Sequence, residues 1–260
     1  MVEYIIREAN DDDIPDIVNL RQRIKEFQPI GKEEYISFWK SWIKENPCSI
    51  QKALVAVDDQ KRIIAHYAIV PFKFLKNGEA LVGGFICQLM VDKDFRHELI
   101  FPKIVLRLLR EYKGLGIDFA YSLSSRSEVV KAHQAFGFCK VGVLSVYARP
   151  YKLANLAQHL IKNKLLNIII RPVLSIAENV LRLKRCTNVR GLVVEEMSKF
   201  DATIDPFLTK VQKHFPYCAL RNSATLNWRT LHSSARKYKA MVVKEEGDIV
   251  GCLILRHMKM

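Results

Sequence analysis

The chain has 260 residues, of which 49% are apolar, so it can bury a core large enough for one large or two small globular domains. It holds no run of about 18 or more uncharged apolar residues and opens without a basic, apolar and cleavage-site sequence. These features argue against a membrane-spanning helix and lead us to expect a cytoplasmic protein, while the net charge of +14 favours an anionic partner.

The first stretch of the chain predicts a strand and two helices. Residues 2–8 read as a strand, and the acidic run Asp11–Asp13 offers an N-cap for a helix whose apolar side chains recur at helical spacing. A second helix is predicted over 33–45, where aromatic and apolar residues mark one face, and Pro47 ends it. The chain therefore opens in the order strand, helix, helix.

Three consecutive strands follow, joined by short turns. One turn lies at Asp58–Lys61, and Asn77-Gly78 forms the next, so we expect antiparallel pairing. Beyond these strands, Pro102 suits the first turn of a helix that runs towards Gly114. The predicted strands cover residues 53–58, 62–75, 79–91, 117–123 and 138–148, and a short helix over 126–136 precedes the last of them.

Residues 149–190 differ in composition from the rest of the chain. They hold nine basic residues against one acid, which is +8 of the total of +14. Their apolar stretch at 165–177 is too short to span a bilayer and is interrupted by Arg171-Pro172, so basic amphipathic helices are predicted. We interpret them as a helical linker packed on the core; the alternative is a surface for a membrane or an acidic protein.

The segment from 190 to 260 repeats the opening of the chain: a strand, a helix entered near Asp201, an aromatic region and a hairpin. The hairpin at 239–256 matches the one at 52–69 in pattern and in its place within the unit. The repeat stops at Met260. We expect either a truncated form of a longer chain or a partial copy that completes its sheet by packing on the first domain.

The order of elements over residues 2–148 and three local sequences together resemble the GNAT (Gcn5-related N-acetyltransferase) superfamily. The segment from Leu89 to Phe101 resembles the family's strand end, loop and helix start, and Ala135-Phe136-Gly137-Phe138 resembles its "aromatic, three residues, Gly-Phe" ending. The hairpin at 53–70 stands where the family has its second and third strands. The resemblance implies an α/β (α+β) fold with a mixed, mostly antiparallel twisted sheet flanked by helices.

On this resemblance the chain divides into three parts. Residues 1–148 would form a GNAT-like acyl-CoA-binding domain, 149–188 a basic helical connector, and 189–260 a partial second GNAT-like unit. The implied donor substrate is acetyl-CoA or another acyl-CoA, the implied acceptor is an amine, and no metal is implied. The acceptor itself cannot be identified, because acceptor pockets in this fold are built from variable helices and loops.

The loop before the helix at Pro102 is the implied donor site. A loop that opens a helix presents free backbone N–H groups beside the positive end of the helix dipole, which suits a pyrophosphate. By position, Arg96, His97, Glu98, Leu99, Ile100 and Phe101 would form this cradle, Leu89, Met90 and Val91 would meet the pantetheine arm, and Ser124 would lie beside it. Leu99 and Phe101 stand where the family usually has glycine, which allows a close approach of the phosphate. The alternative is a loop that merely joins strand to helix.

Catalysis in the family needs an acid for the leaving thiolate, commonly a tyrosine four residues before the glycine of Gly-Phe. That position here is His133, which can donate a proton near neutral pH; the alternative is an exposed or helix-capping histidine without a role. No Asp, Glu or His lies between Ala80 and Val91, where the family often has a carboxylate. The remaining candidates for a base are His66, Glu79 and Gln88, and the Gln88 amide can only orient a water or the amine.

The resemblance therefore implies an N-acyltransferase that acts on an amine. A catalytically degenerate GNAT-fold scaffold that acts through its basic surface on an acidic protein, a membrane or a nucleic acid is the alternative. No zinc-finger, RNA-recognition or helix-turn-helix signature accompanies the charge, so nucleic acid is not the expected partner. The six cysteines lie at least 32 residues apart and have no zinc-ligand spacing.

Overall fold

The computed structural model describes residues 3–24, 31–48, 52–124, 126–145, 170, 172–176, 191–231 and 238–256. The chain divides into two compact units, one made of Met1–Cys139 with Val193–Met260 and the other of Lys140–Leu192. The elements named below belong to the first unit, apart from the first residue of β6. Within the described ranges, no helix is both long and apolar enough to cross a membrane.

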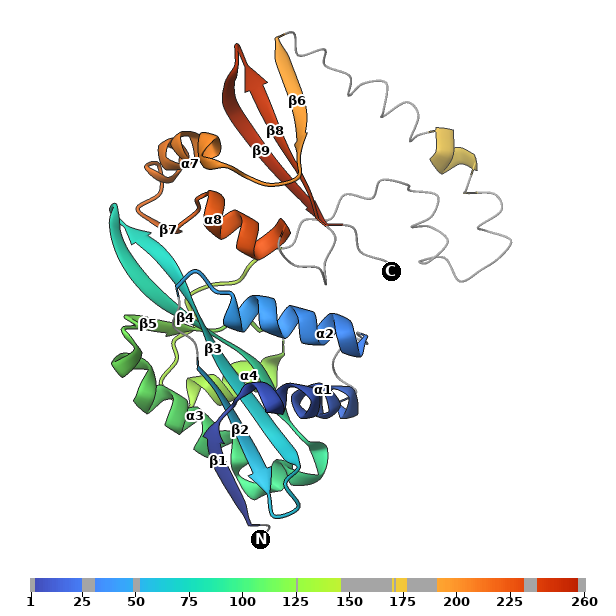
Figure 1. Ribbon diagram of the computed structural model, residues 1–260, viewed down its shortest axis with the longest axis vertical. Helices are drawn as coiled ribbons and strands as arrows, with labels where there is room; N and C mark the ends of the chain where they lie inside the picture. Colours follow the sequence, from blue (N-terminus) through green and yellow to red (C-terminus); the bar gives the residue numbers. More distant parts are fainter. Residues whose placement is uncertain are drawn as a thin grey trace. The chain divides into compact units, whose positions relative to one another are not determined.

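The N-terminal part of the first unit is built around a six-stranded mixed sheet (Figure 1). Its strands are β1 (Tyr4–Glu8), β2 (Lys52–Asp58), β3 (Ile63–Lys76), β4 (Glu79–Val91), β5 (Phe119–Tyr121) and β7 (Tyr217–Ala219). Strands β1 to β4 pair antiparallel in chain order, β5 joins β4 in parallel, and β7 pairs antiparallel with the end of β3. The predicted mixed, mostly antiparallel sheet is therefore confirmed.

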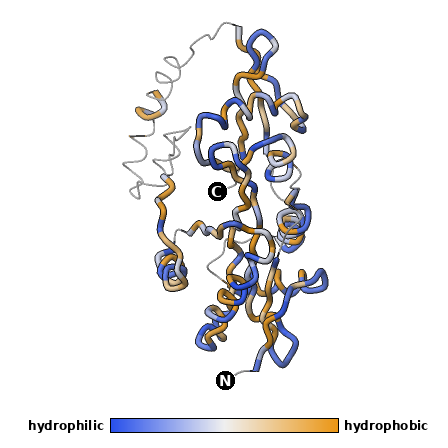
Figure 2. Tube along the Cα trace, turned by 90° about the vertical axis from the view of Figure 1, so that its left-hand side faces the viewer, coloured by the Kyte–Doolittle hydropathy of each residue, from blue (hydrophilic) through white to orange (hydrophobic). Residues whose placement is uncertain are grey.

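Helices cover both faces of this sheet, and the helices predicted near the N-terminus are confirmed. Helix α1 (Ile14–Arg23) and helix α2 (Lys32–Trp39), which continues into the π-helical turn η2 (Lys40–Lys44), bury their apolar stripes against one face. Helix α3 (Ile100–Glu111) covers the other face. Because successive strand residues point to opposite faces, β3 contributes alternately to the core beneath α1 and α2 (the α1–α2 core) and to the core beneath α3 (the α3 core). Figure 2 shows hydrophobic and hydrophilic stretches alternating along the described trace.

The parallel contact between β4 and β5 requires a glycine at position 84. A Cβ atom there would lie 2.4 Å from the Cδ1 atom of Ile69, a fully buried residue of β3, and 3.0 Å from Ile117 just before β5. The missing side chain lets the buried side chains of the neighbouring strand pack directly on the β4 backbone.

Several short helices connect the main elements of this part of the chain. They are η3 (Lys93–Glu98), η4 (Tyr112–Leu115) and α4 (Ser127–Gln134), and η1 (Asp11–Asp13) precedes α1. The predicted strand over 138–148 is wrong for its described part, because residues 138–145 form no strand. Val141 and Val143 are exposed there, so their β-branched side chains have no sheet face to cover.

The C-terminal segment builds a second, three-stranded sheet in the order β6-β8-β9. Its elements are β6 (Leu192–Met197), η5 (Ala202–Ile204), α7 (Asp205–Gln212), α8 (Ser223–Leu226), the π-helical turn η6 (Asn227–Leu231), β8 (Tyr238–Glu245) and β9 (Asp248–Arg256). The predicted hairpin is confirmed as β8 and β9, whereas β7 was not predicted. Buried Trp228 donates its indole N–H to the carbonyl of Ser41 at 2.8 Å.

The three-part division of the chain stays a prediction. Of the connector predicted over 149–188, only residues 170 and 172–176 are described, and these are helical. The remainder of that segment lies outside the described residues. A second, partial copy of the first fold likewise stays a prediction.

Candidate active site

A cavity of about 400 Å³ lies where β4 and β5 part. Strand β5 pairs only with Gly83–Phe85 of β4, and beyond that pairing both segments line the cavity, β4 through residues 86–91 and the segment after β5 through Ser122–Ser124. Arg96, Phe101 and one face of α4 also line it, together with Tyr67 of β3. The cavity thus brings together the end of a strand, the start of one helix and the side of another.

A β-bulge interrupts β4 inside this cavity. His66 pairs with Met90 and Ala68 pairs with Cys87, so Gln88 and Leu89 together oppose the single residue Tyr67. Gln88 has a φ of 57°, a left-handed conformation that is uncommon outside glycine. A bulge leaves its extra residue out of the ladder, and the bulge residues line the cavity. The backbone of these two residues therefore departs from the regular ladder with β3 at the wall of the cavity.

Side chains from α2 and β3 hold the bulge from the side of the α1–α2 core. The Gln88 carbonyl can only accept a hydrogen bond, so His66 Nδ1 donates to it at 3.0 Å. His66 Nε2 then accepts from the Trp39 indole N–H at 3.5 Å, and the Tyr35 hydroxyl donates to Gln88 Oε1 at 2.8 Å. Burial lowers the pKa of His66 to about 4, against the opposing effect of the Gln88 carbonyl, so the ring is neutral near pH 7.

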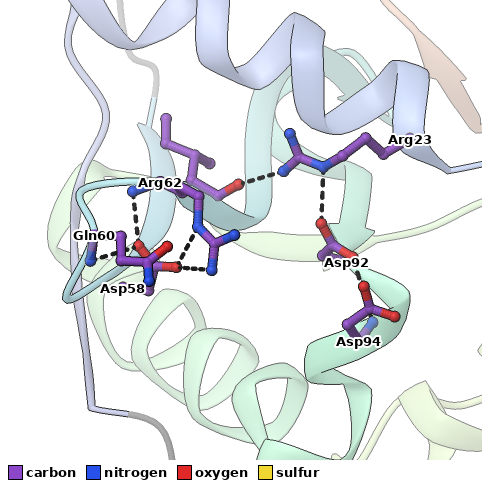
Figure 3. Close-up of polar contacts among 7 residues, drawn as sticks. Arg23, Asp58, Gln60, Arg62, Asp92 and Asp94 are labelled. Atoms are coloured by element: carbon purple, nitrogen blue, oxygen red, sulfur yellow. Dashed lines mark hydrogen bonds and ion pairs between the residues drawn. The ribbon is translucent and has the colours of Figure 1, made fainter.

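The turn from β4 into η3 is anchored by charged side chains (Figure 3). Arg23 at the end of α1 donates from Nε to Asp92 Oδ2 at 2.8 Å and from its terminal nitrogen to the Ile63 carbonyl at 3.0 Å. Asp92 is nearly buried and caps η3 by accepting from the Asp94 N–H. The guanidinium of Arg62 lies 5.7 Å from the centre of the Phe95 ring. These contacts fix the loop that enters α3.

Leu99, at the junction of η3 and α3, takes the conformation that glycine usually supplies. Its φ is 54°, its side chain is 64% exposed, and it does not line the cavity. Leucine at this position therefore keeps the left-handed backbone and directs its side chain to solvent.

The residues beside Leu99 are held by other parts of the fold. Ile100 is buried in the α3 core, and the Glu98 carbonyl accepts from the Tyr4 hydroxyl at 3.1 Å. His97 Nε2 lies 3.2 Å from Glu98 Oε1.

His133 of α4 faces the cavity from the side of the α3 core and is only 6% exposed. Its Nδ1 lies 2.8 Å from the Val129 carbonyl and its Nε2 lies 2.6 Å from the Tyr67 hydroxyl. Because a carbonyl only accepts, Nδ1 carries a proton, and in the neutral ring Nε2 accepts from Tyr67. Burial raises the pKa of Tyr67 above its ordinary value, so the phenol stays protonated. Tyr67 and His133 form one hydrogen-bonded pair on the cavity wall.

The structure gathers eight of the twelve predicted site residues around the cavity. Those that line it are Gln88, Leu89, Met90, Val91, Arg96, Phe101, Ser124 and His133. The other four predicted cradle residues, His97, Glu98, Leu99 and Ile100, do not line it. The alternative of an exposed His133 is wrong, since that ring is buried. Of the candidates for a base, His66 faces the bulge from the far side and Glu79 is exposed at the start of β4.

Tyr67 and Cys87 line the cavity and were not predicted from the sequence. Both lie on strands whose apolar pattern is typical of a buried core. Tyr67 bonds His133, which lies 66 residues further along the chain, so no local pattern indicates the pair. Burial raises the pKa of the Cys87 thiol to about 12, so near pH 7 it offers no thiolate for attack. The only available signal was period-two alternation, which places Tyr67 on the opposite face from His66.

A family model described as an acetyltransferase (GNAT) domain matches residues 5–149, which is more than half of the chain. The chain belongs to the GNAT acetyltransferase family. The matched residues of this GNAT chain include β1 without its first residue, β2 to β5, α1 to α4 and every residue that lines the cavity. No curated protein gives a significant match to the GNAT chain.

Solved structures similar to this GNAT chain include three named acetyltransferases. Glucosamine-6-phosphate N-acetyltransferase from Arabidopsis thaliana is 18% identical, with 57% of this chain and 99% of that chain covered and a TM-score of 0.45. A predicted acetyltransferase with acetyl-CoA from Clostridium acetobutylicum is 20% identical, with coverages of 56% and 96% and a TM-score of 0.47. A GNAT family N-acetyltransferase from Escherichia coli in complex with CoA is 23% identical, with coverages of 53% and 69% and a TM-score of 0.42.

Proposed function

We propose that this chain is an N-acyltransferase that moves an acetyl or longer acyl group from acyl-CoA to an amine. The observation that carries the proposal is one cavity that joins the β4 bulge, Arg96 at the entry to α3, and the Tyr67–His133 pair. An acyl-CoA donor needs a positive group for its phosphates, N–H groups for its thioester carbonyl and a proton for its leaving thiolate. Arg96, the bulge and the Tyr67–His133 pair would supply these in turn.

The donor would lie along the second half of β4 with its phosphates towards α3. Leu89, Met90 and Val91 line that path, Arg96 adds a positive charge, and Ser124 lines the cavity from the segment after β5. The exposed side chain of Leu99 leaves the start of α3 open to a phosphate. When bound, acyl-CoA supplies the activated acyl carbonyl and the thiol leaving group.

The Tyr67–His133 pair would supply the proton that the departing thiolate takes. When His133 carries both ring protons, Nδ1 still donates to the Val129 carbonyl and Nε2 donates to the Tyr67 oxygen, which frees the phenolic proton for the cavity. The proton then passes from Tyr67 to sulfur as His133 passes its own to Tyr67. The amine that forms the new C–N bond loses one proton to water, so charges and atoms balance.

Titration calorimetry of the full chain with CoA, acetyl-CoA and a long-chain acyl-CoA tests the donor site. Arg96→Ala should weaken CoA binding roughly 10- to 100-fold, the loss expected for one hydrogen bond to a charged group. Arg110→Ala is the matched control, because Arg110 is exposed in the last turn of α3 and does not line the cavity. Equal losses in both variants would mean that only the overall charge attracts CoA.

The transfer step is tested by thiol release from acetyl-CoA with a panel of primary amines. Amine-dependent release that falls at least about 100-fold in the Tyr67→Phe variant is the expected result. Absence of CoA binding at both low and raised salt would overturn the proposal and favour a scaffold that has lost its donor site.

A further inference from the structure

A hydrogen-bonded chain from α2 to the β4 bulge stands out among the buried polar groups. His66 and Tyr35 are almost completely buried, and both direct a polar atom to the same residue, Gln88. His66 bonds its main-chain carbonyl, Tyr35 bonds its side-chain amide, and Trp39 bonds the far nitrogen of His66. Burying a polar group costs free energy unless it is hydrogen-bonded, so these groups stabilise one another in this arrangement.

Gln88, the residue that these groups contact, has a strained backbone conformation. Gln88 has a positive φ, and the register of β3 and β4 skips one residue at this point. Strained residues persist where the surroundings fix them, and here the fixing atoms come from helix α2 and from β3. The peptide unit that follows the Gln88 carbonyl carries the N–H of Leu89. A bond that fixes the carbonyl therefore also fixes the direction of that N–H.

We infer that Tyr35, Trp39 and His66 are positioning residues that hold the Gln88–Leu89 peptide so that its N–H polarises the carbonyl of the acyl donor. The inference rests on the proposed function, and it assigns α2 a part in the reaction although Tyr35, Trp39 and His66 act only through Gln88. The three side chains lie on the α1–α2 side of the sheet, whereas the Tyr67–His133 pair lies on the α3 side. The residues that position the N–H and the pair that supplies the proton thus lie on opposite faces of one sheet.

The matched variants follow from the contacts. Tyr35→Phe removes the hydroxyl that meets Gln88 Oε1 and keeps the ring. His66→Leu removes both ring nitrogens, while His66→Asn keeps a side-chain N–H near the place of Nδ1. Tyr112→Phe, at a half-buried tyrosine after α3, is the control that removes a hydroxyl elsewhere.

Two spectroscopic measurements test the positioning of the Gln88–Leu89 peptide without requiring turnover. The Trp39 indole N–H resonance of the ligand-free protein should move in His66→Leu, because its acceptor is gone, and stay in Tyr112→Phe. The carbonyl stretch of bound [1-¹³C]acetyl-CoA should be lowered relative to the free thioester in the wild type. In His66→Leu and Tyr35→Phe it should return towards the free value, while the dissociation constant of acetyl-CoA changes less than about twofold.

Steady-state kinetics with acetyl-CoA and an amine provide the third test. A displaced N–H should lower kcat roughly 10- to 100-fold at unchanged KM for the donor, and His66→Asn should recover a large part of the loss. Because Tyr35 acts through Gln88, the Tyr35→Phe/Gln88→Leu double variant should be no slower than Gln88→Leu alone. Tyr112→Phe should match the wild type.

The outcomes separate this inference from the proposed function. A wild-type chain that does not bind acetyl-CoA overturns both. Normal binding with the same carbonyl stretch in wild type, His66→Leu and Tyr35→Phe overturns the inference and leaves the proposed function standing. A loss of kcat that the double variant shows to be additive would also overturn it, since Tyr35 would then act independently of Gln88.

Discussion

Replacing Tyr67 by phenylalanine isolates a single hydroxyl group at the centre of the site. The ring is 1% exposed, so Phe preserves the packing against the α3 core and removes only the bond to His133 Nε2 at 2.6 Å. His133 is itself buried, and its Nε2 would lose its donor. Leaving a buried acceptor unsatisfied costs about 1–3 kcal/mol in the free energy of unfolding. For a chain of this size each kcal/mol lowers Tm by about 2–4 °C.

The same substitution tests catalysis. If the hydroxyl delivers the proton to the leaving thiolate, kcat should fall at least about 100-fold, which is the lower end of what a general acid contributes. Binding of CoA should stay within about twofold, because the pair acts on the leaving group only as the C–S bond breaks. A variant at the partner, His133→Leu, should give a similar loss, and the double variant should lose little more than either single one.

Urea unfolding and amine-dependent thiol release measure the two effects separately. A fall in stability with full turnover would show that Tyr67–His133 is only a structural contact, and the acid assignment would be wrong. Unchanged stability together with unchanged turnover would refute the geometry itself, because a buried histidine nitrogen cannot lose its donor without cost.

Three further predictions concern the framework of the site. Leu99→Gly should raise the free energy of unfolding by up to about 1 kcal/mol, because glycine adopts a φ of 54° without the cost to leucine; a lower Tm would contradict this. His66 is buried neutral with a pKa of about 4, so its contribution is present above pH 6.5 and on the order of 3 kcal/mol is lost as the pH falls to 4. His66→Asn should therefore flatten the pH dependence of urea unfolding in that window. Gly84→Ala should destabilise by about 1–3 kcal/mol, since its Cβ would meet buried Ile69, and an unchanged Tm would refute the close packing.

Apolar periodicity and turn residues predicted most elements of the GNAT region, because these signals are local. Helices α1 to α4 and strands β1 to β5 all fall within the predicted segments or within a few residues of them. The strand predicted over 138–148 failed in its described part, since a β-branched run forms a strand only where another strand pairs with it. Strand β7 was missed for the converse reason: three residues, Tyr217–Ala219, carry too little pattern, and β3 provides the pairing.

Residues of the candidate site could be predicted where their position along the chain places them in the cavity. They could not be predicted where the pairing of two strands places them there. The resemblance pointed to His133, four residues before Gly137, and to Arg96 in the loop before α3, and both line the cavity, while their roles stay predictions. No local pattern reveals that β4 carries a bulge at Gln88, because a bulge is a relation between two strands. The same holds for Tyr35 and Tyr67, whose hydroxyls find partners 53 and 66 residues away.

His66 and Tyr67 show why register matters most for this site. They are neighbours on β3, and their side chains point to opposite faces, one to the Gln88 carbonyl and one to His133. A slip of β3 by one residue would exchange the two faces and place a neutral histidine against α4 and a phenol against the bulge. The bulge in β4 lies opposite Tyr67, so the irregularity that presents Gln88 and Leu89 to the cavity is tied to the same register. The pairing of β3 with β4 thus fixes, at one point of the sheet, both the groups that would polarise the donor carbonyl and the pair that would protonate the leaving thiolate.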